Sequence, residues 1–98
     1  MIRTLALVAV LAVSSVHAQG RDASDPDVER LRTELRALDT DPSMASLAGV
    51  ERLKARQAVD SLAGASRRER EHRLYLAERR IATARAAAEA ELLRQQAQ

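Results

Sequence analysis

The chain has 98 residues, with 16 basic and 14 acidic side chains, no cysteine and a single aromatic residue. This length allows at most one small domain, and it excludes most enzyme scaffolds. Because only 3 glycines and 2 prolines stand against 20 alanines and 13 leucines, the composition argues against a sheet fold, collagen or a disordered chain. It predicts an all-helical protein.

Residues 1–18 have the form of a cleaved secretory signal peptide. Arg3 supplies a positive charge, an apolar run of nine residues follows over 5–13, and the small residues Val16 and Ala18 stand at positions −3 and −1 of a cleavage site. The alternative is a transmembrane anchor, but the apolar run is about half of the roughly 20 residues that cross a bilayer. We therefore predict cleavage between Ala18 and Gln19.

The predicted mature chain begins with a polar linker over 19–24, and a helical domain follows over 25–98. We expect this chain to be periplasmic or secreted, with no transmembrane helix and no cysteine to accept a lipid. Small exported domains often use disulfides because they cannot build a large core. Without cysteine, stability must come from packing or partners, which makes self-association or an envelope protein partner an expectation.

A first helix is predicted over about 26–39. Asp25 is a helix cap, Pro26 suits the first helical position, and Asp27 lies beside the positive end of the helix dipole. Four apolar residues follow at spacings of three, four and three, which places them on one stripe: Val28, Leu31, Leu35 and Leu38.

A second helix is predicted over about 43–63. Asp41 and Pro42 repeat the start signal. One face of this helix would carry Met44, Leu47, Ala48, Ala55, Ala58, Val59 and Leu62. Gly49 interrupts that run, so the helix could instead begin near Val50.

The last helix is predicted over about 67–97. Ser66 and Glu69 form a capping box before it. Its principal apolar stripe consists of Leu74, Ala77, Ile81, Ala84, Ala88 and Leu92. Such a stripe packs on the first two helices, which predicts an antiparallel helical hairpin or a three-helix bundle with a long C-terminal helix.

A thinner apolar stripe lies on another side of the last helix. It consists of Tyr75, Ala82, Ala86 and Leu93, with His72 and Arg79 along its line. A helix with two apolar sides can pack against the protein's own core and also against a second surface. We therefore take His72, Tyr75 and Arg79 as a candidate interaction surface. The alternative is that these residues pack at the edge of the hairpin, or that alanine is there as a good helix former and Arg79 is solvated.

Fifteen of the 16 basic residues are arginine, and eight of them lie on the last helix. Three oppositely charged pairs four residues apart predict salt bridges along a solvated helix: Arg67 with Glu71, Glu69 with Arg73, and Arg85 with Glu89.

Binding to nucleic acid would need a basic face without acids, or aromatic platforms, so no nucleic-acid partner is predicted. Membrane-surface binding is the weaker alternative, because no tryptophan or phenylalanine is present to anchor the chain.

The sequence lacks the residue patterns that common catalytic mechanisms require. His72 is the only histidine after the predicted cleavage site, and the chain has no cysteine, no HExxH motif and no glycine-rich phosphate loop. Ser61 and Ser66 have no base or orienting acid at a position that can be argued from the sequence. The prediction is a non-enzymatic protein with no catalytic residue, no cofactor, no metal site and no evident small-molecule substrate.

The last helix carries a resemblance to a known family. It rests on residues 72–82, on 41–42 with 47–48, and on 55–58, within a stretch that covers about 28–91. These residues resemble a bacterial envelope family called domain of unknown function 4398. The resemblance implies an alanine-rich helical domain that follows a signal peptide or lipoprotein signal and often precedes an OmpA-like peptidoglycan-binding domain. The 98 residues contain no cysteine for lipidation, and we expect no OmpA-like domain to accompany this one. The family has no established activity that a residue here could inherit.

Two functions follow as expectations. The first is an interaction or assembly module of the bacterial cell envelope, which would self-associate or bind an OmpA-like or other envelope protein. The alternative is a peripheral lipid-binding or periplasmic stress-related helical protein.

Overall fold

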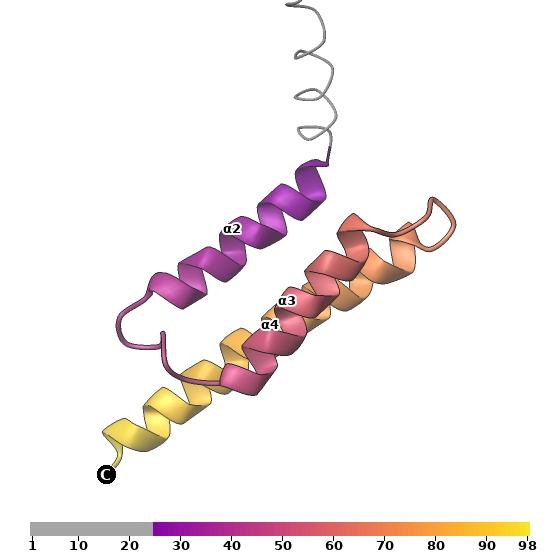
Figure 1. The fold of residues 1–98 in the computed structure, drawn as a ribbon. Helices are drawn as coiled ribbons and strands as arrows, with labels where there is room; N and C mark the ends of the chain where they lie inside the picture. Colours follow the sequence, from indigo (N-terminus) through magenta and orange to yellow (C-terminus); the bar gives the residue numbers. More distant parts are fainter. Residues whose placement is uncertain (1–24) are drawn as a thin grey trace, which may run out of the picture.

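A computed structural model describes residues 25–98, which form three α-helices (Figure 1). In chain order they are α2 (Pro26–Thr40), α3 (Gly49–Ala63) and α4 (Arg70–Gln96). Helices α3 and α4 form an antiparallel hairpin, and α2 lies beside it with its start near the start of α4 (Figure 1). Residues 25–98 contain no strand, so the prediction of an all-α fold with a long last helix is confirmed. The predicted signal peptide, its cleavage site at Ala18 and Gln19, and the linker over 19–24 lie outside the described residues.

Helix α2 begins as its sequence predicts. The Asp25 carboxylate accepts a hydrogen bond from the Val28 N–H at 3.2 Å, and Pro26 is the first helical residue. This cap satisfies one of the N–H groups that a helix leaves without a partner in its first turn.

Helix α3 begins at Gly49, so the predicted start at residue 43 is wrong and the alternative start near Val50 is close to the observed one. The Asp41 carboxylate accepts from both the N–H and the hydroxyl of Ser43, at 2.9 and 2.8 Å, and this stabilises a turn. Ala48 then adopts a left-handed conformation with φ 54, which a continuous right-handed helix cannot include. The Ala48 N–H donates to Glu91 of α4 at 3.2 Å, which holds this turn against the hairpin.

Helix α4 begins at Arg70, three residues later than predicted, and ends at Gln96. The Glu69 N–H donates to the Ser66 hydroxyl at 3.3 Å and to the Ser66 carbonyl at 3.1 Å. The second bond spans three residues, so residues 67–69 form a tighter turn before the α-helix starts. Only the Ser66 half of the predicted capping box therefore forms, one turn ahead of the helix, and within residues 25–98 the Glu69 carboxylate does not accept from the Ser66 N–H.

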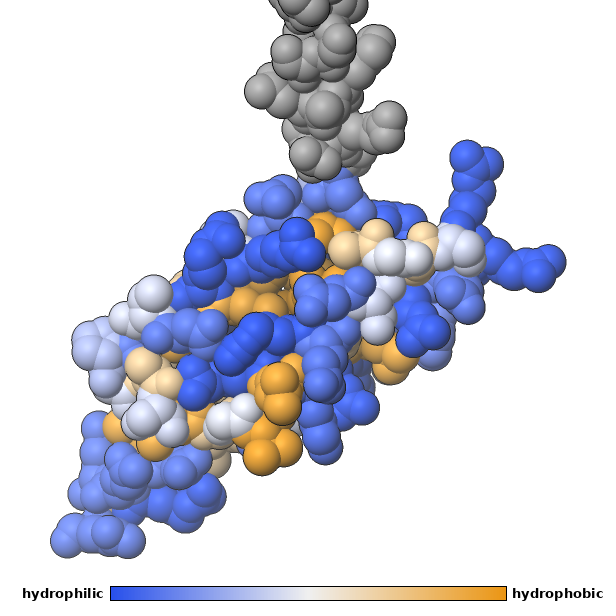
Figure 2. Space-filling model, in the orientation of Figure 1, coloured by the Kyte–Doolittle hydropathy of each residue, from blue (hydrophilic) through white to orange (hydrophobic). Residues whose placement is uncertain are grey.

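The core lies between the three helices. It consists of Val28, Leu31, Leu35, Leu38, Leu47, Ala48, Ala55, Val59, Leu62, Ala77, Ile81, Ala84 and Ala88. The predicted stripe of α2 is buried in full, and Leu74 and Leu92 of the α4 stripe pack against the core as partly buried residues. In the space-filling view, apolar side chains line the seam between α2 and α3, and hydrophilic residues cover most of the surface around it (Figure 2).

Leu31→Ala is expected to lower the free energy of unfolding by about 2–5 kcal/mol, because it leaves a cavity at a fully buried site. Leu53→Ala removes the same atoms from a side chain that is 53% exposed, and it should cost less than about 1 kcal/mol. Urea unfolding followed by circular dichroism measures both variants. Equal losses in the two would contradict the docking of α2 on the hairpin.

Candidate functional site

The predicted surface residues lie together on one side of α4. His72, Tyr75 and Arg79 are three and four residues apart, a spacing that aligns side chains along one line of a helix. All three are exposed, while Leu74 and Ala77 on the other side face the core.

Tyr75 and Arg79 contact each other on this side. The guanidinium carbon of Arg79 lies 5.8 Å from the centroid of the Tyr75 ring, which is cation–π geometry. The ring is 54% exposed, so this contact leaves much of the aromatic surface open to solvent. The pair forms a small site with an apolar part and a positive charge.

The exposed line continues toward the end of α4. Ala82 and Ala86 are exposed, and Leu93 is 65% exposed. We call the side that carries His72, Tyr75, Arg79, Ala82, Ala86 and Leu93 the outer face of α4. All six side chains of this face are exposed in the fold.

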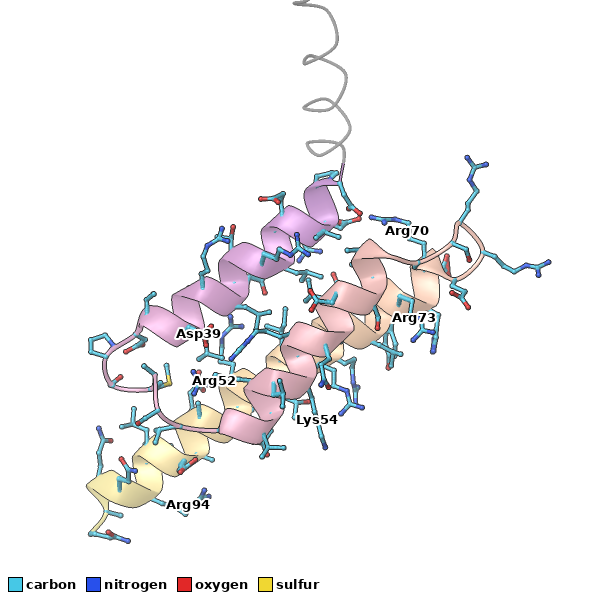
Figure 3. All side chains as sticks on the ribbon, in the orientation of Figure 1. Asp39, Arg52, Lys54, Arg70, Arg73 and Arg94 are labelled. Carbon is cyan, nitrogen blue, oxygen red and sulfur yellow. The ribbon has the colours of Figure 1, made fainter. Side chains whose placement is uncertain are left out.

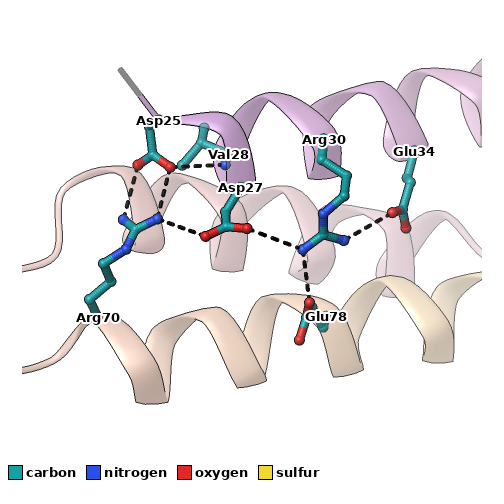
Figure 4. Close-up of polar contacts among 7 residues, drawn as sticks. All are labelled: Asp25, Asp27, Val28, Arg30, Glu34, Arg70 and Glu78. Carbon is teal, nitrogen blue, oxygen red and sulfur yellow. Dashed lines mark hydrogen bonds and ion pairs between the residues drawn. The ribbon is translucent and has the colours of Figure 1, made fainter. Parts of the chain in front are cut away.

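A network of ion pairs ties α2 to α4 (Figure 4). Arg70 donates to both carboxylate oxygens of Asp25, at 3.0 and 2.8 Å, and to Asp27 at 3.1 Å. Hydrogen bonds from Arg70 are the main cause that lowers the pKa of Asp25 below its usual 3.8, and the bond from Val28 lowers it further against the opposing effect of burial. The same carboxylate thus caps α2 and joins it to the start of α4.

Arg30 forms the second link between these helices. It donates to Glu78 of α4 at 2.9 Å and to Glu34 of α2 at 3.3 Å (Figure 4). The bond to Glu78 is the main cause that raises the pKa of Arg30. Arg30 and Glu78 are 48 residues apart in sequence, so no local spacing rule could have found the pair.

The most buried ion pair joins the end of α2 to α3. Arg52, whose side chain is 11% exposed, lies 2.9 Å from Asp39. Its Nε is buried and has no hydrogen-bond partner within residues 25–98. Arg56 approaches the same carboxylate at 3.9 Å, and Arg52 and Asp39 point toward each other across the seam between the helices (Figure 3).

The three salt bridges predicted along α4 are absent from the described residues. Arg67 with Glu71, Glu69 with Arg73, and Arg85 with Glu89 do not approach within 4.0 Å. Exposed pairs of this kind contribute little free energy and cost side-chain entropy, so their spacing alone does not ensure contact. The ion pairs that do form lie mainly between helices.

A groove of about 340 Å³ runs between α3 and α4. Its lining consists of Lys54, Gln57, Ala58, Ser61, Arg73, Leu76 and Arg80. Three of these residues are cationic and none is acidic. Sequence reasoning missed the groove, because its two walls come from different helices.

Two further findings concern residues 25–98 alone. None of the three helices has the length and hydropathy that crossing a bilayer requires. No group of three or more histidine, aspartate or glutamate side chains gathers there in a way that could hold a metal ion.

The chain matches no protein-family model, no curated protein and no solved structure. The resemblance to the envelope family therefore stays a prediction.

Tyr75→Ala is expected to change the free energy of unfolding by less than about 1 kcal/mol, because the ring is largely exposed. Ile81→Ala, six residues further along α4 but fully buried, should cost about 2–5 kcal/mol. Thermal unfolding of both variants tests the assignment of the two sides of α4. A large loss in Tyr75→Ala would mean that this residue packs in the fold after all.

Acidification is expected to weaken the attachment of α2. Since folding lowers the pKa of Asp25, its stabilisation is complete well above the usual value of 3.8 and is lost as the pH falls through the lowered folded value. Asp25→Asn keeps the helix cap but removes the charge, so its stability should be lower at pH 7 and should fall less steeply below about pH 4.

Urea unfolding between pH 7 and pH 2 measures this difference. Asp60→Asn is the matched control, since Asp60 is 74% exposed and pairs with Arg32 only at 3.6 Å. The control should keep the pH dependence of the wild type. An Asp25→Asn variant with an unchanged slope would show that the carboxylate does not stabilise α2.

Proposed function

We propose that this chain is a non-enzymatic, exported helical protein that acts as an interaction or assembly module of the bacterial cell envelope. The contact surface is the outer face of α4. The proposal rests on one observation: this face carries Tyr75 and Leu93, two of the large apolar side chains that the fold leaves more than half exposed.

The chemistry of the face suits a helical protein surface. Between Tyr75 and Leu93 the line carries Ala82 and Ala86, whose small side chains allow a second helix to approach closely. Aromatic and arginine side chains are enriched among the residues that dominate binding energy at interfaces. Tyr75 and Arg79 would supply this anchor, and the alanines would supply the close fit.

A second copy of the chain is the simplest candidate partner. The alternative partner is a different envelope protein. In a symmetric dimer the same surface serves both subunits, so the outer face of α4 would pack on itself. The small, disulfide-free core makes the added burial valuable for stability. The export of the chain and its place in the envelope rest on the predicted signal peptide and on the family resemblance.

Light scattering over a concentration series should give about twice the chain mass at high concentration. The double variant Tyr75→Ala/Arg79→Ala should stay folded by circular dichroism and become monomeric, because its anchor is lost. The control Leu53→Ala/Arg36→Ala also removes one large exposed apolar side chain and one exposed arginine, from α3 and α2, and it should associate as the wild type does.

If the wild-type protein is monomeric, the partner is expected to be another envelope protein. Crosslinking in intact envelopes then tests the proposal. There the wild type and the control should form the same adduct, and Tyr75→Ala/Arg79→Ala should not. A monomer that forms no adduct, or an adduct that all three proteins form equally, would overturn the proposal.

A further inference from the structure

The cations on the two sides of the α3–α4 hairpin differ in whether they pair with carboxylates. On the side that faces α2, the hairpin arginines Arg52, Arg56 and Arg70 pair with carboxylates of α2 or of its cap. In the groove between α3 and α4, Lys54, Arg73 and Arg80 have no carboxylate of residues 25–98 within 4.0 Å. Figure 3 shows Lys54 and Arg73 on the side of α3 that is turned away from α2.

The groove brings these like charges together from two helices. Arg73 and Arg80 are seven residues apart, which places them two turns apart on the same side of α4. Lys54 comes from the antiparallel α3, on the opposite wall. Like charges that share a small site repel one another, so an anion between them would be stabilised by all three.

Neutral donors complete the site. Gln57 and Ser61 lie three and seven residues after Lys54, so the same wall of α3 presents an ammonium, an amide and a hydroxyl in sequence. Ala58 and Leu76 supply the apolar part of the lining. The groove therefore combines cations, neutral donors and a small apolar surface.

This donor set fits a phosphate group. A phosphate ester offers several oxygens, and arginine forks and a lysine ammonium are the side chains that bind such oxygens most strongly. A volume of about 340 Å³ suits a small polar molecule rather than a polymer. We propose that the α3–α4 groove binds a small phosphate-bearing group through Lys54, Arg73 and Arg80, with Gln57 and Ser61 as neutral donors.

The phosphate could belong to a soluble phosphate ester or to the headgroup of an anionic phospholipid. The apolar side chains of the groove are compatible with either source. This site is separate from the outer face of α4, so it does not depend on the proposed assembly function, and either proposal can fail without the other.

Three probes separate the sources. Inorganic phosphate and glycerol 1-phosphate are titrated into the purified protein, while the backbone amide signals of Gln57 and Ser61 are followed by nuclear magnetic resonance. Vesicles of phosphatidylglycerol in phosphatidylcholine are compared with phosphatidylcholine vesicles by cosedimentation. Saturable shifts with the soluble probes would assign a soluble phosphate ester, and binding to the anionic vesicles alone would assign the lipid headgroup.

The variant Lys54→Gln/Arg73→Gln/Arg80→Gln should bind whichever probe is active at least about tenfold more weakly, because three charge-assisted contacts are lost. The control Arg67→Gln/Arg68→Gln/Arg85→Gln removes three cations that do not line the groove. It changes the net charge equally and should lose less than about threefold. Circular dichroism shows whether both variants keep their helices.

Two results would overturn the proposal. The first is no response of the wild type to any of the three probes. The second is an equal loss in the groove variant and the control, which would mean that anions are attracted only by the overall charge. If the triple variant unfolds, Ser61→Ala and Arg80→Gln are measured singly. Unchanged affinity in both single variants would also overturn the proposal.

Discussion

Close packing of α3 against α4 is the constraint on which the rest of the structure depends. The buried side of α4 carries Ala77, Ala84 and Ala88, and Ala55 faces them from α3, all of them fully buried. Small side chains let two helix backbones approach closely, and the larger Ile81 and the leucines of the neighbouring helices fill the remaining space. Alanine is thus a core residue here as well as a helix former.

This hairpin carries both of the surfaces for which we propose a function. Its seam uses one side of α4, so Tyr75 and Leu93 on the outer face are left in solvent. The approach of the two helices also forms the walls of the basic groove, which Lys54 lines from α3 and Arg80 lines from α4.

Helix α2 is attached by two kinds of interaction. Its leucines fill the space over the hairpin, and this burial supplies most of the free energy. The ion pairs of Arg70 and Arg30 contribute less, because they are partly exposed. They act mainly on orientation, because they join the start of α2 to the first three turns of α4 and so set the position of α2 along the hairpin.

The sequence by itself determined the helical class, the cap at Asp25, and the apolar stripes of α2 and α4 that face the core, because caps and stripes depend on residues within a few positions of each other. Only the tertiary structure decided where α3 begins, since the turn before it is held by Glu91. It also decided the ion pairs of Arg70 and the groove of Lys54, Arg73 and Arg80, because their members come from different helices. Local patterns specify which side of a helix is apolar, but the packing of helices decides which charges meet.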